Sequence, residues 1–142
     1  LEFRRVLFRS TAYINRLPDY TDLDLDFLRH PTTSDVSKKI GDEAIKRSIR
    51  NLIFTNHYDR PFQSVIGSNI RKILFDNASP ITAALLKDAI TEVINNFEPR
   101  VRLTDVTVTD DSDNNGYSVR LQYIILNREM PITTNLFLER IR

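Results

Sequence analysis

The segment from Ser79 to Leu126 constrains the fold of this 142-residue chain more than any other. It opens with Ser79-Pro80, a strong helix N-cap followed by the residue that is best tolerated at the first helical position. Apolar residues then recur at near-helical spacing until Pro99: Ile81, Leu85, Ala89, Val93 and Phe97, joined by Ala84, Leu86, Ile90 and Ile94. This broad stripe predicts a helix over 80–97 at the centre of the core.

A β-hairpin is predicted directly after Pro99. Val106 and Val108 share one face of the first strand. In the second strand, alternate residues likewise share one face of that strand: Tyr117, Val119, Leu121, Tyr123 and Ile125. Asn115-Gly116 lies between them and is the pair favoured in a two-residue turn, where both residues need positive φ. A third extended segment over 131–141 follows, with Leu136 and Leu138 on one face of the strand.

Two shorter helices are predicted upstream. Asp42 is expected to cap the first, whose inward residues are Ile45, Ile49, Leu52 and Ile53. A loop over 55–67 contains Arg60-Pro61-Phe62, and a short second helix is expected from Ser68. Because helices precede an antiparallel sheet, we predict an α+β fold with about three helices followed by a small sheet made of the hairpin and a C-terminal strand.

The residues before Gly41 divide into two parts. Residues 1–10 begin without methionine and alternate basic with bulky apolar residues, but lack the apolar core and cleavage site of a signal peptide. We interpret them as a non-native leader. Acidic and apolar residues alternate from Tyr20 to Phe27, which is typical of an extended segment with one covered face. We therefore expect an extended arm over 11–40, lying along the body or a partner, ahead of a domain over 41–142.

Composition argues against several classes of partner. Twenty basic residues nearly balance 19 acidic ones, so no overall field attracts the chain to nucleic acid or a membrane. Apolar runs such as Tyr123–Leu126 are too short to span a bilayer. There is no cysteine for disulfide or thiolate chemistry. The basic residues Lys46, Arg47 and Arg50 favour a solvated helix face, with contact to an acidic partner as the alternative.

Motifs for metal or catalytic chemistry are weak. The run 111–116 matches the start of a calcium-binding loop, but Gln122 stands where a bidentate Glu is needed. A polar hairpin tip is the favoured interpretation. His30 and His57 have no neighbouring ligands for a zinc site. We predict no catalytic residue, no metal and no cofactor.

Glu98 and Arg100 flank Pro99 at the junction of helix and hairpin. Glu43, Glu92 and Glu98 are candidates for glycosidase carboxylates by residue type alone. A pair between Glu98 and Arg100 would lower the pKa of the glutamate, which is the wrong direction for a general acid. The junction is therefore either a local structural clasp or a docking point for a partner.

Four features together resemble one family. They are Arg60-Pro61-Phe62 with Gly67 downstream, the Ser79-Pro80-Ile81 helix start, Asn96-Phe97-Glu98-Pro99-Arg100, and the strand-turn-strand finish. The combination is similar to the baseplate wedge protein that initiates the tail sheath in contractile-tailed phages. The family includes the corresponding baseplate subunit of type VI secretion systems and is often labelled "lysozyme-like". The resemblance covers about residues 41–142.

The resemblance implies a structural, non-enzymatic subunit of the virion tail baseplate, assembled in the host cytoplasm in several copies set by the symmetry of the assembly. Its implied partners are the baseplate wedge proteins and the tail sheath subunit, with no nucleic acid and no membrane. Glu98, Pro99 and Arg100 would dock on the wedge, with Arg60, Pro61 and Phe62 as further contacts. The last sheet, with Leu136 and Leu138, would receive sheath strands, because an exposed edge strand presents unpaired backbone groups. The alternatives are a type VI secretion baseplate subunit and a peptidoglycan-degrading enzyme.

Overall fold

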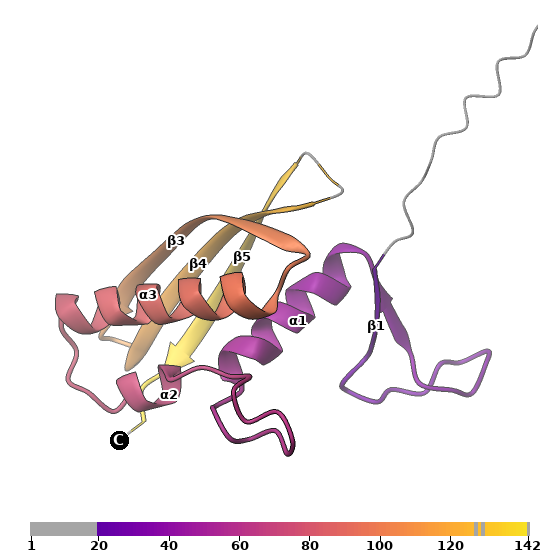
Figure 1. The fold of residues 1–142 in the computed structure, drawn as a ribbon, viewed down its shortest axis with the longest axis horizontal. Helices are drawn as coiled ribbons and strands as arrows, with labels where there is room; N and C mark the ends of the chain where they lie inside the picture. The colour runs from indigo at the N-terminus through magenta and orange to yellow at the C-terminus, as the bar shows by residue number, and fades with distance from the viewer. Residues whose placement is uncertain (1–19, 127, 129, 142) are drawn as a thin grey trace, which may run out of the picture.

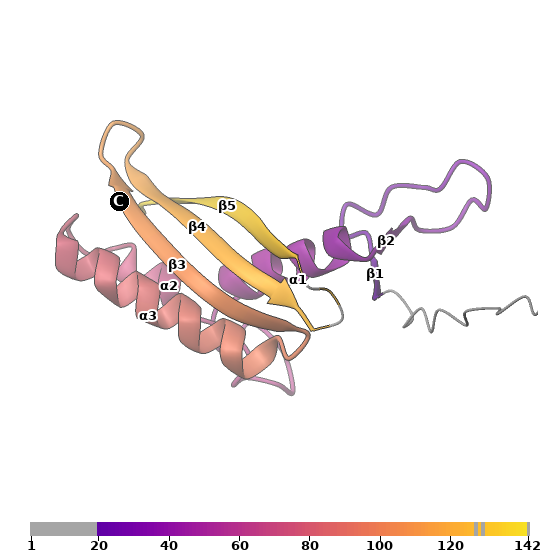
Figure 2. The ribbon, with the colours of Figure 1, turned by 90° about the horizontal axis from the view of Figure 1, so that it is seen from above.

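Helices cover one face of a three-stranded antiparallel sheet in the computed structural model, which describes residues 20–126, 128 and 130–141 (Figures 1 and 2). The sheet has the order β3-β4-β5. The elements in chain order are β1 (Thr21–Leu23), β2 (Lys38–Ile40), α1 (Asp42–Phe54), α2 (Ile70–Ile73), α3 (Pro80–Phe97), β3 (Val101–Asp111), β4 (Gly116–Ile125) and β5 (Pro131–Glu139). The predicted α+β class, with three helices before the sheet, is confirmed.

The central strand β4 supplies one wall of the core. All five of its predicted inward residues are buried: Tyr117, Val119, Leu121, Tyr123 and Ile125. They pair across the sheet with inward residues of both neighbours, as in Val106 opposite Leu121 and Leu138 opposite Tyr117. The other wall comes from α1 and α3 through buried residues such as Ile49 and Ile90. Strict alternation thus predicted the β4 face correctly, because the side-chain period of a strand leaves only two choices.

The predicted inner face of α3 was only partly right. The Ser79 cap is confirmed, since its Oγ accepts a hydrogen bond from the Thr82 N–H at 3.1 Å. The buried residues are Thr82, Leu86, Ile90, Val93 and Ile94. Ile81 and Leu85, which the stripe placed inward, are 73% and 48% exposed. The apolar arc of this helix is wider than the surface that the sheet can cover, so periodicity alone could not choose the buried side.

The predicted two-residue turn at Asn115-Gly116 was wrong. Asn115 has a positive φ of 51°, but Gly116 already pairs with Asp111 as the first residue of β4. The loop therefore spans residues 112–115. Gly116 is required for a different reason, because a Cβ there would lie 2.7 Å from the Leu138 carbonyl oxygen. Close approach to β5, and not turn geometry, explains this glycine.

The start of α1 also differs from the prediction. Gly41, with a φ of 65°, occupies the N-cap position without a side-chain hydrogen bond, and Asp42 is the first helical residue. The Asp42 carboxylate pairs with Arg128 Nη1 at 2.6 Å, which ties the helix start to the connection between β4 and β5. The second helix is shorter than expected, although Ile70 and Leu74 are buried as predicted.

Residues 20–40 form a hairpin in which β1 pairs antiparallel with β2 (Figure 1). We call residues 20–40 the acidic hairpin, because Asp22 and Asp24 face the rest of the molecule while Leu23, Phe27 and Leu28 are more than half exposed. The proposed leader over 1–10 and the start of the proposed arm at 11–19 lie outside the described residues.

The buried face of α3 in the structure predicts that substitutions at two isoleucines of this helix differ in their effect on stability. Ile90→Ala should lower the free energy of unfolding by about 2–5 kcal/mol, because it removes buried methylenes and leaves a cavity. Ile81→Ala, at an exposed position, should change it by less than about 0.5 kcal/mol. Urea unfolding followed by circular dichroism measures both. Equal losses for the two variants would contradict the phase.

Candidate functional site

The helix-to-sheet junction is held by a bidentate ion pair. Glu98 follows the last residue of α3 and is only 3% exposed. Arg100 donates from Nε to Glu98 Oε1 at 2.6 Å and from Nη2 to Oε2 at 2.8 Å. Ser48 of α1 donates its hydroxyl to Oε2 at 2.5 Å. The carboxylate is therefore satisfied within the chain, and the junction is a structural clasp.

Arg100 also connects the junction to the acidic hairpin. Its Nη1 donates to Asp22 Oδ2 at 3.2 Å, and its guanidinium lies over the Tyr20 ring at 5.5 Å from the centroid. One side chain thus joins the end of α3, the start of β3 and β1. Pro99, between the paired residues, is exposed. We call Asp22, Ser48, Glu98 and Arg100 the corner clasp.

The clasp sets the protonation of its members. Burial alone would raise the pKa of Glu98, but the hydrogen bonds from Arg100 and Ser48 and the charge of Arg100 outweigh it, so the pKa lies below its usual value. The hydrogen bond to Glu98 raises the pKa of Arg100. Both groups stay charged near neutrality, and Glu98 is not poised to donate a proton.

A second set of ion pairs fixes the acidic hairpin on α1. Asp24 is 1% exposed and contacts Arg47 Nη1 at 3.1 Å and Lys39 Nζ at 3.3 Å. Arg47 Nη2 also pairs with Asp26. One face of this segment is covered in part by the basic side of α1, since Asp24 is buried there while Asp26 is more than half exposed. Of the basic residues that favoured a solvated face, Arg47 is engaged within the chain.

A groove of about 530 Å³ opens beside the clasp, between the acidic hairpin, α1 and the loop over 55–67. We call it the corner groove. Arg47, Arg60 and Arg100 line it together with apolar residues, namely Leu23, Leu25, Ala44, Leu52, Ile66 and Phe97. Arg60 makes no ion pair with the described residues, whereas Arg47 and Arg100 are both engaged. The groove thus brings together two of the motifs that the sequence singled out.

The loop that carries Arg60-Pro61-Phe62 is braced by its own backbone. Tyr58 N–H donates to the Ser64 carbonyl at 3.0 Å, and Ser68 N–H donates to the Thr55 carbonyl at 2.8 Å. Phe62 is fully exposed at a φ of 69°. A bulky residue at positive φ is strained, and such strain is often associated with functional loops. Only Arg60 of the three lines the corner groove.

Strand β5 is an edge strand whose side chains and backbone have different surroundings. Leu138 is 1% exposed and Leu136 is partly buried, so these two residues pack on the core. The Arg140 N–H bonds to the Asn115 carbonyl, and antiparallel alternation from there directs the N–H groups of Asn135 and Phe137 away from β4. In the described part of the chain β5 pairs only with β4. The free edge of β5 therefore offers its backbone, and not these two leucine side chains, to a partner.

The free edge of β5 borders a second groove, of about 610 Å³, which we call the β5 groove. Thr134, Asn135 and Leu136 form one wall. The other wall comes from α1, β2 and the acidic hairpin, and it carries two acidic residues, Asp26 and Glu43, beside four basic ones: Lys39, Lys46, Arg47 and Arg50. An extended segment has room beside β5 here.

The remaining candidates have local structural roles. His57 Nδ1 lies 3.1 Å from the Val65 carbonyl, and the His30 ring accepts from the Thr32 and Thr33 N–H groups. Asp111 bonds to Asn114 within the hairpin tip. Among the described residues there is no cluster of three or more potential metal ligands. No helix in that part of the chain has the length and apolar character of a membrane span.

Sequence reasoning missed Asp22, Asp24 and Ser48 as partners of the clasp and of α1. The alternation of acids in 22–26 was a visible signal that one side of this segment needs basic partners. Ser48 had no signal, because it is one of several polar residues on α1 and becomes special only when Glu98 lies beside it.

Solved structures share this fold. One is the baseplate of the anti-feeding prophage, with a TM-score of 0.61 and 21% identity, covering 87% of this chain and 88% of that one. A second is a putative tail lysozyme from Geobacter sulfurreducens, with a TM-score of 0.59 and 22% identity over 69% and 91% of the two chains. A third is the postcontracted baseplate of pyocin R2, with a TM-score of 0.51 and 16% identity over 83% and 98%.

The fold is therefore one found in baseplates of contractile particles. The family model for baseplate wedge protein gp25 matches residues 40–129, and baseplate wedge protein gp25 of Enterobacteria phage T4 is 30% identical over 116 residues, which cover 82% of this chain and 86% of that protein. The chain belongs to the baseplate wedge protein gp25 family, and the resemblance inferred from the motifs is confirmed.

The lowered pKa of Glu98 predicts a pH dependence of stability. A group whose pKa is lower in the folded state stabilises the fold above its unfolded pKa, and this contribution is lost as the pH falls through the folded pKa. The native protein should therefore lose stability below about pH 4.3, the ordinary value for glutamate. The variant Glu98→Gln lacks this titrating group and keeps the other acids. It should therefore lose less stability than the native protein over the same pH range. Urea titrations at pH 3 to 7 measure the difference, and parallel curves would refute the assignment.

Proposed function

We propose that the protein is a non-enzymatic baseplate wedge subunit that docks on other wedge proteins through the corner groove and offers β5 to the first ring of tail sheath. Family membership supports the wedge assignment. The observation that carries the docking half is that Arg60 and Arg100, from separate motifs, line one groove. The number of copies would follow the symmetry of the baseplate. The baseplate would be part of the virion tail and would be assembled in the host cytoplasm.

The chemistry of the corner groove favours a particular kind of wedge segment. Apolar residues line it together with Thr21, Asp22, Ser48 and Asn51, between three guanidinium groups, two of which already have carboxylate partners. Arg60 is the cation still open to a partner's carboxylate, and Phe62 and Pro61 project from the same braced loop. A segment with apolar residues and an acidic residue would fit, because exposed aromatic and arginine side chains are typical anchors of interfaces.

Glu98 and Arg100 act in this proposal by positioning the groove. Glu98 is buried, so direct contact with a wedge partner is left to Pro99 and to the exposed part of Arg100. Reversing the charge of Arg100 would leave two acids unpaired at the clasp and destabilise the fold. Such a variant cannot separate docking from folding, which makes Arg60 the better position for a test.

Strand addition at β5 supports the sheath half of the proposal. The edge has outward backbone groups and an adjacent groove in which the four basic residues outnumber the two acidic ones. An extended sheath segment could pair with β5 through main-chain hydrogen bonds, and an acidic residue in it would face Lys46 or Arg50. Leu136 and Leu138 would support this edge from the core side.

A peptidoglycan-degrading activity has little support. The name of the Geobacter sulfurreducens relative is its only positive indication. A glycosidase needs one carboxylic acid with a raised pKa, whereas the pKa of Glu98 is lowered. Glu43 and Glu92 lie on separate helices at exposed positions. The alternative of a type VI secretion baseplate subunit involves the same fold and mechanism in another particle. The genes that neighbour this one would distinguish the two.

Arg60→Glu should weaken binding to the other wedge proteins of the same particle at least tenfold, about 1.4 kcal/mol, because it introduces repulsion at the unpaired site of the corner groove. Arg71→Glu is the matched control, since Arg71 is exposed on α2 and does not line the groove. Isothermal titration with the purified wedge proteins measures both. Equal affinity of the two variants would exclude the groove as the docking site.

Asn135→Pro should block sheath polymerisation on assembled baseplates while the domain stays folded, because it removes a backbone donor from the free edge of β5 and none from its pairing with β4. Asn135→Ala keeps that donor and should support normal polymerisation. Electron microscopy of sheath length on baseplates carrying each variant makes the comparison. Normal sheaths on the folded proline variant would rule out pairing at this edge.

A further inference from the structure

The acidic hairpin is attached to the rest of the molecule with very little apolar burial. Its turn end projects away from the helices and the sheet (Figures 1 and 2). Phe27, Leu28 and Ile40 are all more than half exposed. Of residues 20–40, all of which the structure describes, only Asp24 is buried. Since burial of apolar surface is the main force that holds segments of a protein together, another interaction must keep this hairpin in place.

Three aspartates supply ionic contacts to the body. Asp22 accepts a hydrogen bond from Arg100 Nη1 at 3.2 Å, and Asp24 and Asp26 both pair with Arg47. Ion pairs that are partly exposed to water contribute little each. Asp24 is only 1% exposed, but detachment would return its carboxylate to water and so recover the cost of burying it. The attached and detached states should therefore lie close in free energy.

The base of the hairpin provides a pivot. Gly41 joins β2 to α1 at a positive φ of 65°, which favours glycine, and its N–H donates to the Tyr20 carbonyl at 2.7 Å. Tyr20 packs against the hydrophobic core, and the Arg100 guanidinium lies over its ring. The two ends of the hairpin are thus held together at the body. A two-stranded hairpin is marginally stable by itself, so its outer part depends on the three aspartates.

Detachment would uncover the side of α1 beneath the hairpin. Ala44 is 0% exposed although it does not belong to the main hydrophobic cluster. It lines the corner groove together with four residues of the hairpin: Thr21, Asp22, Leu23 and Leu25. Arg47 and Arg100 line the same groove, and the aspartates of the hairpin occupy both. The hairpin therefore fills with its own carboxylates the positions that the carboxylates of another polypeptide would take.

We propose that the acidic hairpin is an electrostatic latch, which an acidic segment of another polypeptide opens by replacing its aspartates at Arg47 and Arg100. Opening uncovers Ala44 and widens the corner groove. The latch is a property of the free chain, and only its effect on docking rests on the proposed function. Because the tests below use the free chain, failure of the latch is distinguishable from failure of the corner groove as a docking site.

The sequence contains no cysteine, so a single introduced thiol can report opening in the full chain. Ala44→Cys places the thiol beneath the hairpin, and Val119→Cys places it in the core on β4, at a position that is 1% exposed. The measurement is the rate of reaction with a soluble thiol reagent. Raising sodium chloride from about 0.01 M to about 1 M, which shortens the screening length from about 30 Å to about 3 Å, should speed the reaction at position 44 about tenfold or more.

The thiol at position 119 is the control for unfolding of the whole domain. Its rate should stay the same, because screening weakens ion pairs and not apolar burial. An unchanged rate at position 44 would overturn the proposal. Equal acceleration at both positions would also overturn it, since that result means that salt unfolds the domain and does not detach the hairpin alone.

A matched pair of variants tests the role of the buried aspartate. In the Ala44→Cys chain at low salt, Asp24→Asn should speed labelling about tenfold, because it removes the charge that pairs with Arg47. Asp35→Asn is the control: Asp35 lies in the same hairpin, is exposed and makes no ion pair with the described residues. It should leave the rate unchanged. Equal rates for the two variants would refute attachment through Asp24.

An acidic peptide tests the exchange of carboxylates. Oligoglutamate is compared with oligoserine of the same length, at up to millimolar concentration and in buffers of matched ionic strength. Oligoglutamate should speed labelling at position 44 several-fold relative to oligoserine, because its carboxylates can pair with the arginines that the hairpin occupies. The same rate with both peptides would contradict opening by an acidic segment.

Discussion

The buried pair of Glu98 and Arg100 is the interaction on which the geometry of the molecule most depends. A carboxylate that is 3% exposed is costly unless it is fully paired, and two hydrogen bonds from Arg100 and one from Ser48 meet that need. The same arginine reaches Asp22, so α1, the end of α3, the start of β3 and the acidic hairpin share one set of contacts. The direction in which β3 leaves α3, and the shape of the corner groove, follow from it.

Local signals predicted those parts of the fold that local chemistry determines. Ser79-Pro80 and Pro99 fixed the ends of α3, and the alternation in β4 fixed its buried face. The buried side of α3 was not predictable, because apolar residues surround much of the helix and only the sheet decides which are covered. The contact of Asp22 with Arg100 spans 78 residues, so no local pattern could reveal it. The Glu-Pro-Arg motif does lie at this corner, but the hydrogen bonds of Glu98 are made to residues of the same chain.

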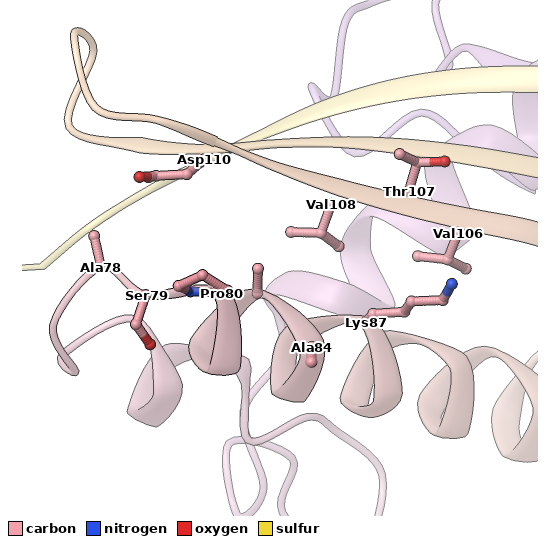
Figure 3. A pocket seen from close by; sticks show the side chains of 10 residues that line it. Ala78, Ser79, Pro80, Ala84, Lys87, Val106, Thr107, Val108 and Asp110 are labelled. Carbon is pink, nitrogen blue, oxygen red and sulfur yellow. The ribbon is translucent and has the colours of Figure 1, made fainter.

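The sheet has three strands, and both of its outer strands border a groove. Small sheets with open edges risk uncontrolled pairing, and β3 carries acids and a register shift between Leu103 and Asp105 that limit it. The two edges differ in charge. The β5 groove is lined by four basic and two acidic residues. A groove of about 560 Å³ beside β3 has one cation, Lys87, and one anion, Asp110, at opposite ends (Figure 3).

The acidic hairpin connects the corner groove to the β5 groove. Leu25, Arg47 and Asn51 line both, and Arg47 is held by Asp24 and Asp26 of the hairpin. A shift of the hairpin on α1 would therefore change the shape and charge of both grooves together, so the proposed docking at the corner and the proposed pairing at β5 would have a shared physical link. The groove beside β3 has no residue in common with either and is lined by residues of α3, of β3 and of the connection just before α3.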